Sequence, residues 1–203
     1  MLYDSIREDS EMTPTNNVTV YVAPVVKQGK AEDQIYCFLA GGITDCWDWQ
    51  KAVIDSICSD PEYKENLVLF SPRRSNFPID DPNAAEEQIT WEFKYLEQCD
   101  IFSMYFCNGD SDQPICMYEL GRNIALMQHK FPIDWEKRII ITVEKGYKRT
   151  ADVIIQTKLA TDGAVTVRVY ETPEEAVKDH IENIKIAARS IPFDSSTKAD
   201  TEK

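Results

Sequence analysis

The sequence predicts an α/β fold in which helices cover both faces of one doubly wound, largely parallel, five-stranded sheet. Strand-like and helix-like segments alternate five times between residues 35 and 188, and such alternation produces parallel strands joined by helical crossovers. The run at residues 35–40 is apolar throughout, as a strand that is buried on both faces requires. The 203 residues fit one domain that is long enough to bury a core.

The predicted α/β domain spans residues 17–190, because both ends of the chain are polar. Residues 1–16 are expected to form a flexible segment, and residues 191–203 a disordered tail. The first segment lacks the apolar stretch of an export signal. A cytoplasmic protein is therefore expected.

Strands are predicted where β-branched, aromatic and other apolar residues gather. In chain order they lie at residues 18–23, 35–40, 67–70, 100–106, 138–143 and 165–170. We expect the five alternating units to take the flavodoxin-like order 2-1-3-4-5 of Rossmann-like sheets. In that order the strand with Tyr36 lies beside the strand that Asp100 opens, and the gap between them is the switch point where ligands bind.

Helices are predicted between the strands from apolar residues at spacings of three and four. Their apolar faces contain Trp49, Val53, Ile54 and Ile57; Ala85, Ile89, Phe93 and Leu96; Met117, Leu120, Ile124 and Met127; and Val177, Ile181, Ile184 and Ala188, with a short helix near Val153. Asp81-Pro82 is expected to open the second helix, and Pro114 suits the first turn of the third. Thr172-Pro-Glu-Glu175 has the pattern of a capping box.

The charge of the chain argues against polyanionic partners. A net charge of −13 disfavours a nucleic-acid polymer or an anionic membrane surface, and no run of 18 apolar residues is present to span a bilayer. A small molecule in a local pocket remains compatible with this charge.

The sequence offers no signature of a metal or cofactor site, so none is expected. The six cysteines never form Cys-x-x-Cys, and the two histidines lie far from one another, which disfavours zinc and suits reduced thiols. Gly41-Gly42 lacks the third glycine of a dinucleotide fingerprint. Gly-Lys-Ser/Thr and Gly-x-Ser-x-Gly, the patterns of a P-loop and of a hydrolase elbow, are absent as well.

Four loops leave the carboxyl ends of predicted strands and are expected to form one rim. They begin at Gly41-Gly42, at Ser71 before Arg73 and Arg74, at Asn108 with Asp112 downstream, and at Glu144 before Arg149. Glu119 lies about one turn into a helix and faces this rim. Each of these residues also has a purely structural interpretation. A carboxylate near a helix start can interact with the helix dipole, two glycines can form a tight turn, and arginines are common on the surface. The residues alone therefore leave their roles open.

Six motifs in register resemble the nucleoside 2-deoxyribosyltransferase-like proteins. They are Phe38-Leu-Ala-Gly-Gly-Ile43, Asp48-Trp-Gln50, Ser71-Pro-Arg-Arg74, Gln88-Ile-Thr-Trp-Glu92, Asp100 and Tyr118-Glu-Leu-Gly121. The resemblance runs from about Ile35 to Ile184.

The resemblance implies a role for each residue that matches. Glu119 corresponds to the nucleophile, and Asp100 to the group that helps to bind and protonate the base or the sugar. Gly41 and Gly42 correspond to the loop that lines the nucleobase pocket. The further candidates for binding substrate are Arg73, Arg74, Glu92, Asn108, Asp112 and Arg149. The family's sugar-holding Asp, six residues before the nucleophile, is replaced here by Gln113, with Asp110 and Asp112 nearby.

Three functions follow as hypotheses. The first is cleavage or transfer of the N-glycosidic bond of a (deoxy)nucleoside or nucleotide, through a covalent glycosyl intermediate on the glutamate. A free nucleobase is the acceptor in a transferase, and water is the acceptor in a hydrolase. The second is a non-catalytic nucleotide-binding sensor, and the third is an assembly module. The resemblance also implies a homo-oligomer, since relatives commonly complete the pocket with a neighbouring subunit.

Overall fold

A six-stranded parallel sheet forms the centre of the protein, which is described here by a computed structural model over residues 17–192. The strands are β1 (Val18–Val22), β2 (Ile35–Gly41), β3 (Leu67–Ser71), β4 (Ile101–Phe106), β5 (Ile139–Glu144) and β6 (Arg168–Tyr170). The helices are α1 (Trp49–Cys58), α2 (Ala84–Gln98), α3 (Pro114–Lys130), α4 (Thr150–Ala160) and α5 (Pro173–Ser190), with a short 3-10 helix η1 (Trp135–Arg138). The predicted flexible segment 1–16 and residues 193–203 of the predicted tail lie outside the described residues.

The predicted fold class is confirmed. The order β1-β3-β2-β4-β5-β6 contains the expected 2-1-3-4-5 arrangement in its last five strands, and every pairing in it is parallel. The sheet has one strand more than the five predicted, because β1 pairs with β3 along the outer edge. At the switch point β2 lies beside β4, with Gly41 opposite Tyr105.

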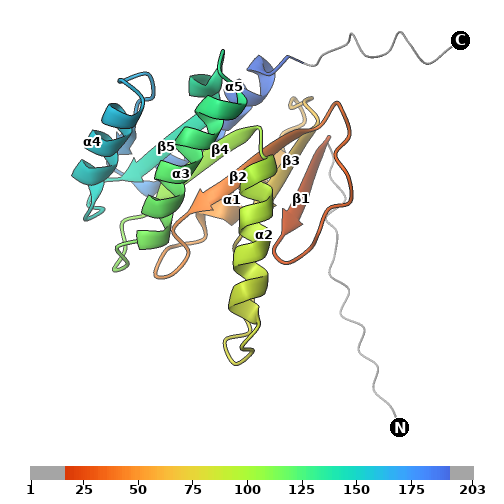
Figure 1. The fold of residues 1–203 in the computed structure, drawn as a ribbon, viewed down its shortest axis with the longest axis horizontal. Helices are drawn as coiled ribbons and strands as arrows, with labels where there is room; N and C mark the ends of the chain where they lie inside the picture. The colour runs from red at the N-terminus through yellow and green to blue at the C-terminus, as the bar shows by residue number, and fades with distance from the viewer. Residues whose placement is uncertain (1–16, 193–203) are drawn as a thin grey trace, which may run out of the picture.

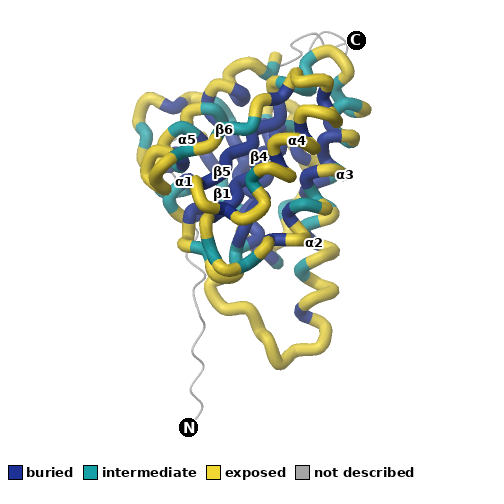
Figure 2. The backbone as a smooth tube through the Cα atoms, turned by 90° about the vertical axis from the view of Figure 1, so that its left-hand side faces the viewer, coloured by how far each residue is buried: buried dark blue, intermediate teal, exposed yellow. Residues whose placement is uncertain are grey.

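Helices cover both faces of the sheet (Figure 1). On one face α2, α3 and α4 pack through residues such as Tyr95, Leu120 and Val153. On the other face α1 and α5 pack through residues such as Val53 and Ile184. The inner strands β2, β3, β4 and β5 are buried throughout, whereas the segment before α2, residues 75–83, is exposed throughout (Figure 2).

Two elements begin more than one residue later than predicted, each for a local reason. The helix α2 begins at Ala84 and not at Pro82, because the Asp81 carboxylate accepts a hydrogen bond from the Asn83 N–H (2.9 Å) in a turn that precedes the helix. The strand β6 is shorter than residues 165–170, because the N–H of Val165 is directed to the Thr161 hydroxyl (3.4 Å) at the end of α4. Polar side chains that bind nearby backbone groups compete with regular structure in this way.

A buried histidine joins α5 to the sheet. The ring of His180 is hydrogen-bonded to the Ser103 hydroxyl of β4 (2.6 Å) and to the Thr142 hydroxyl of β5 (2.8 Å). Burial lowers the pKa of His180 to about 3, and the positive charge of Arg168 contributes in the same direction. His180 is therefore a neutral part of the core at physiological pH.

We expect acid to destabilise the protein through His180. The unfolded chain takes up a proton on this histidine near its ordinary pKa of 6.5, whereas the folded protein takes it up only near 3. Stability is therefore present above the unfolded pKa and is lost as the pH falls from 6.5 towards 3, by up to about 1.4 kcal/mol per pH unit.

Urea unfolding of the wild type and of His180→Gln, at a series of pH values between 7 and 4, measures this effect. The stability difference between the two proteins should shrink as the pH falls. His129→Gln, at an exposed position of α3, is the matched control and should follow the wild type at every pH. A difference between wild type and His180→Gln that stays constant with pH would contradict the assignment.

Candidate functional site

A pocket of about 200 Å³ opens at the carboxyl edge of the sheet, beside the switch point between β2 and β4. Its walls come from β2 and the loop after it, from the loop after β3, from α2, and from the loop and first turns of α3. The lining residues are Phe38, Gly41, Gly42, Ile43, Thr44, Pro72, Glu92, Ser111, Gln113, Pro114, Ile115, Cys116 and Glu119. This volume is below the roughly 300–1,000 Å³ of pockets for drug-sized ligands, so the enclosed part suits a small planar or ring-shaped group.

The loop after β2 needs glycine at Gly41 and passes close to two side chains at Gly42. Gly41 has φ +147°, and a Cβ atom there would lie 2.2 Å from the carbonyl oxygen of Tyr105. A Cβ atom on Gly42 would lie 2.5 Å from both the Gln113 Oε1 and the Cys46 Sγ atoms. The two glycines therefore let this loop pass close to β4 and to the start of α3, which brings its backbone into the pocket wall.

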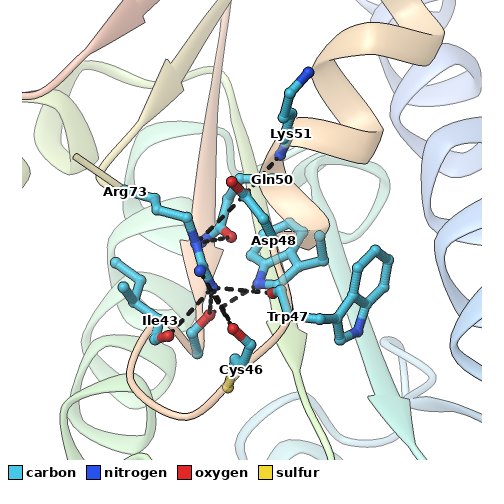
Figure 3. A network of polar contacts seen from close by, with 9 residues as sticks. Ile43, Cys46, Trp47, Asp48, Gln50, Lys51 and Arg73 are labelled. Carbon is cyan, nitrogen blue, oxygen red and sulfur yellow. Dashed lines mark hydrogen bonds and ion pairs between the residues drawn. The ribbon is translucent and has the colours of Figure 1, made fainter. Parts of the chain in front are cut away.

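Arg73 holds the glycine loop in place from behind (Figure 3). Its guanidinium group donates to four backbone carbonyls of the loop at 3.0–3.3 Å, those of residues 42, 43, 46 and 47. Its Nε also donates to the Gln50 side chain (2.9 Å) and lies 3.4 Å from the Asp48 carboxylate. Arg73 is therefore part of the scaffold, and its donors are directed into the loop.

Two half-buried carboxyl groups, Glu92 from α2 and Glu119 from α3, line the same pocket. Burial, and after it repulsion from Glu92, raise the pKa of Glu119 to about 8, although the charge of Arg122 opposes both effects. Burial also raises the pKa of Glu92, opposed by the hydrogen bond that the Gln88 amide donates to it (2.7 Å). Perturbed carboxyl groups of this kind gather at functional sites more often than elsewhere.

The other sequence-predicted residues lie around the pocket or away from it. Arg74 pairs with Glu87 (3.0 Å), and Arg149 pairs with Asp152 (3.0 Å) at the start of α4. Asp112 is exposed between two lining residues, and its carbonyl accepts a hydrogen bond from the Tyr147 hydroxyl. The side chain of Asn108 packs against Gly146, outside the pocket lining.

Asp100 lies at the opposite edge of the sheet from the pocket. It precedes β4, so it belongs to the amino end of the parallel strands. Its carboxylate accepts the N–H of Tyr36 (2.8 Å) and pairs with Lys30 (2.5 Å). The structure therefore does not bring Asp100 together with Glu119.

Several lining residues were not among the candidates. Ser111 and Gln113 lie in the loop between β4 and α3, and Gln113 adopts the left-handed conformation (φ 48°) that starts the helix. Thr44 follows the glycine loop, and Cys116 lies in the first turn of α3. All four residues lie close in the sequence to the predicted glycine and glutamate motifs, and this proximity could have indicated that they line the pocket.

The residues that form this pocket all fall in one segment of the chain. That segment, residues 34–133, matches the model of a protein family described as nucleoside 2-deoxyribosyltransferase like. The predicted family resemblance is confirmed. A search of curated proteins found no match. The nucleoside 2-deoxyribosyltransferase-like segment covers about half of the chain, and it includes both carboxyl groups, the glycine loop and Gln113.

The described part of the chain offers neither a metal site nor a membrane-spanning helix. Among residues 17–192, no three side chains of His, Cys, Asp or Glu are grouped so that they would hold a metal ion. No helix within the same range has the length and apolarity needed to cross a membrane. The six cysteines all lie in this range, and none of them forms a disulfide bond.

We expect Gly41→Ala to destabilise the protein and Gly121→Ala to stabilise it. At Gly41 a methyl group meets a backbone carbonyl in a strained conformation, which costs about 1–3 kcal/mol. Gly121 lies inside α3, and a Cβ atom there meets nothing within 4 Å, so alanine gains about 1 kcal/mol of helix propensity. Chemical denaturation of the two variants measures both effects, and equal stability of the variants would contradict this assignment of the glycine loop.

Proposed function

We propose that this protein cleaves or transfers the N-glycosidic bond of a (deoxy)nucleoside or nucleotide, with Glu119 as the nucleophile. The observation that carries the proposal is the pair of carboxyl groups with raised pKa, Glu92 and Glu119, in one pocket of the family-matched segment. Glu119 also occupies the position that corresponds to the nucleophile in the Glu-Leu-Gly motif.

The proposed reaction proceeds by double displacement at the anomeric carbon of the sugar. The Glu119 carboxylate forms a bond to this carbon as the bond to the base nitrogen breaks, which gives a glycosyl ester and a base that has taken up a proton. A free base or water then attacks the same carbon and releases Glu119. The developing positive charge on the sugar is stabilised by the carboxylate in a partly buried site, where such an interaction is stronger than in water.

Glu92 is the proposed source of the proton for the departing base. It faces the pocket that contains Glu119, whereas Asp100 lies at the other edge of the sheet. Its raised pKa keeps a proton available nearer to neutral pH than an ordinary glutamate allows. A proton that the pair shares also reduces the repulsion between the two carboxyl groups.

The pKa of Glu119 implies that the reaction depends on pH. At a pKa of about 8, only about one molecule in ten carries the ionised nucleophile at pH 7. The same observation favours a second candidate function, a nucleotide-binding sensor that does not turn over, because a protonated Glu119 is a hydrogen-bond donor and a poor nucleophile. The transferase and the hydrolase differ only in the acceptor, a free nucleobase or water.

The proposal includes a cytoplasmic homo-oligomer. Reduced cysteines support the location. Exposed apolar side chains of α2 and α3 beside the pocket support assembly, namely Ile89, Phe93, Ile115 and Tyr118. Sedimentation velocity of the wild type and of Phe93→Glu tests the assembly, and a wild type that sediments as a monomer at all concentrations would exclude it.

We expect Glu119→Gln to bind ligand but to lose base release by roughly a thousandfold or more, because an amide is a poor nucleophile. The variant should also be more stable than the wild type. The unfolded chain ionises near pH 4.5 and the folded one near 8, so ionisation costs the folded wild type stability as the pH rises through this window. The gain should therefore be larger at pH 8 than at pH 5, on the order of 1 kcal/mol.

Chromatography of base release and thermal melting, on the same preparations, measure both effects. Glu62→Gln, at an exposed turn, is the matched control for loss of one glutamate charge. Base release by Glu119→Gln at the wild-type rate would end the nucleophile assignment, and no release by the wild type with any nucleoside or nucleotide would favour the sensor.

We expect kcat/KM of the wild type to pass through a maximum with pH, because the active form needs an ionised Glu119 and a protonated Glu92. Glu92→Gln removes the repulsion on Glu119, so the midpoint of the rising limb should move to lower pH, while the falling limb disappears and the maximum rate drops through loss of the proton donor. Asp100→Asn, at the opposite edge of the sheet, should keep the wild-type profile. An unchanged profile for Glu92→Gln together with loss of activity in Asp100→Asn would reverse the two assignments.

A further inference from the structure

Two cysteines lie against each other beside the pocket. Cys46 belongs to the loop after β2, and Cys107 directly follows β4. Their thiols are hydrogen-bonded to each other, and both side chains belong to the apolar cluster on the α1 and α5 face of the sheet. All six cysteines lie within the described residues, and Cys46 is the one among them that is not buried. This pair therefore combines two neighbouring thiols with access from solvent.

Two glycines let the loops that carry these cysteines approach closely. A Cβ atom on Gly109, in the loop after β4, would lie 2.4 Å from the carbonyl oxygen of Asp45 and 3.9 Å from the Cys46 Sγ atom. A Cβ atom on Gly42 would lie 2.5 Å from the same Sγ atom. The sulfur of Cys46 points away from Arg73, which binds the carbonyl of the same residue (Figure 3). The Cys46 sulfur therefore lies between the two loops, next to a glycine of the pocket wall.

The surroundings of the two thiols make them chemically unequal. The hydrogen bond from Cys107 lowers the pKa of Cys46, and the positive charge of Arg73 adds to this effect, although partial burial and the charges of Glu144 and Asp45 oppose it. The same hydrogen bond, together with burial, raises the pKa of Cys107. Because the thiolate is the reactive form of cysteine, Cys46 is suited to react first and Cys107 to follow.

We propose that Cys46 and Cys107 form a reversible disulfide bond when a hydroperoxide oxidises the protein. The Cys46 thiolate attacks one oxygen of the hydroperoxide, and the O–O bond breaks. This gives the sulfenic acid of Cys46, and the other oxygen leaves with a proton as water or an alcohol. The sulfur of Cys107 then attacks the Cys46 sulfur, and the hydroxyl group leaves as water with the proton of Cys107. The two thiols together lose two electrons and two protons, and the hydroperoxide takes up both.

The proposed bond would join two walls of the pocket. The loop after β2 contributes Gly42 and Thr44 to the lining, and the loop after β4 contributes Ser111. Bonded sulfur atoms lie about 2.05 Å apart, which is closer than two hydrogen-bonded thiols, so bond formation draws the loops together. Thr44 and Asp45 are exposed, which leaves this part of the loop room to move. The inference goes beyond the proposed function, and its tests need no ligand.

Peptide mapping of the wild type after treatment with hydrogen peroxide tests the proposal. Cleavage before aspartates places the six cysteines in six separate peptides, with Cys46 in residues 45–47 and Cys107 in residues 100–109. Alkylation of the monomeric protein under denaturing conditions, before this cleavage, should leave these two peptides linked, and dithiothreitol should release them. Both peptides recovered in alkylated form would overturn the proposal. So would a link from Cys46 to Cys116, the other cysteine with which it interacts.

Cys37 and Cys99 provide an internal comparison. These thiols also interact with each other, but both residues are 0% exposed, so a hydroperoxide does not reach them in the folded protein. Their peptides, residues 33–44 and 81–99, should stay alkylated while the other pair is oxidised. Equal oxidation of the two pairs would show that the peroxide acts on the unfolded chain, and it would overturn the proposal.

Serine variants separate the roles of the two thiols. Cys107→Ser should stop at the sulfenic acid of Cys46, which dimedone labels, because no second thiol resolves it. In Cys46→Ser, oxidation of Cys107 should be about tenfold or more slower than that of Cys46 in the wild type. Cys58→Ser, at the far end of α1, is the matched control and should form the disulfide as the wild type does. Oxidation of Cys107 at the wild-type rate in Cys46→Ser would reverse the assignment.

The reduced wild type allows a test that needs no substitution. Limited iodoacetamide treatment of the folded protein should alkylate Cys46 about tenfold or more faster than each of the five buried cysteines, because it combines exposure with a lowered pKa. The same peptides report the order of labelling. Faster labelling of any other cysteine than of Cys46 would count against Cys46 as the thiol that reacts first.

Discussion

The hydrogen bonds of Arg73 to the loop after β2 are the interaction on which the site depends. The loop makes a close turn at Gly41-Gly42. Three of its carbonyls already accept one hydrogen bond, those of Gly42 and Trp47 from Trp49 and that of Ile43 from the Cys46 N–H. One guanidinium group donates to these three carbonyls and to that of Cys46, and its planar set of five donors is suited to this in a way that a lysine ammonium is not.

This constraint also determines where the positive charge near the pocket is used. The protein has a net charge of −13, so its basic side chains are outnumbered by acidic ones. Arg73, the arginine that contacts the glycine loop, is half-buried and has a structural role. The glycine loop in turn positions Gly42 against Gln113 and the walls of the pocket. The electrostatic character of the pocket therefore follows from how its loop is held together, as much as from the two glutamates that line it.

The sequence predicted the fold well, because alternation and burial on both faces are properties of whole segments. It also predicted Glu119 and the glycine loop as neighbours, since both follow strands that meet at the switch point. It did not predict that Asp100 lies at the amino edge of the sheet. A residue that opens a strand of a parallel sheet lies at that edge, but the family motifs assigned Asp100 to the same site as Glu119. The pairing of Arg73 with the loop was not predictable, because it depends on the path of a turn.

The two glutamates show why the site needs a rigid scaffold. Each carboxyl group is half-buried, and the charge of Glu92 makes the ionised form of Glu119 less favourable, so ionisation of Glu119 reduces the stability of the folded protein. Glu92 comes from α2 and Glu119 from α3, and both helices are held against the sheet by a continuous apolar core that includes Tyr95 and Leu120. Separation of the helices would relieve the repulsion but would expose that core. The packing of the sheet face thus maintains two carboxyl groups in one pocket.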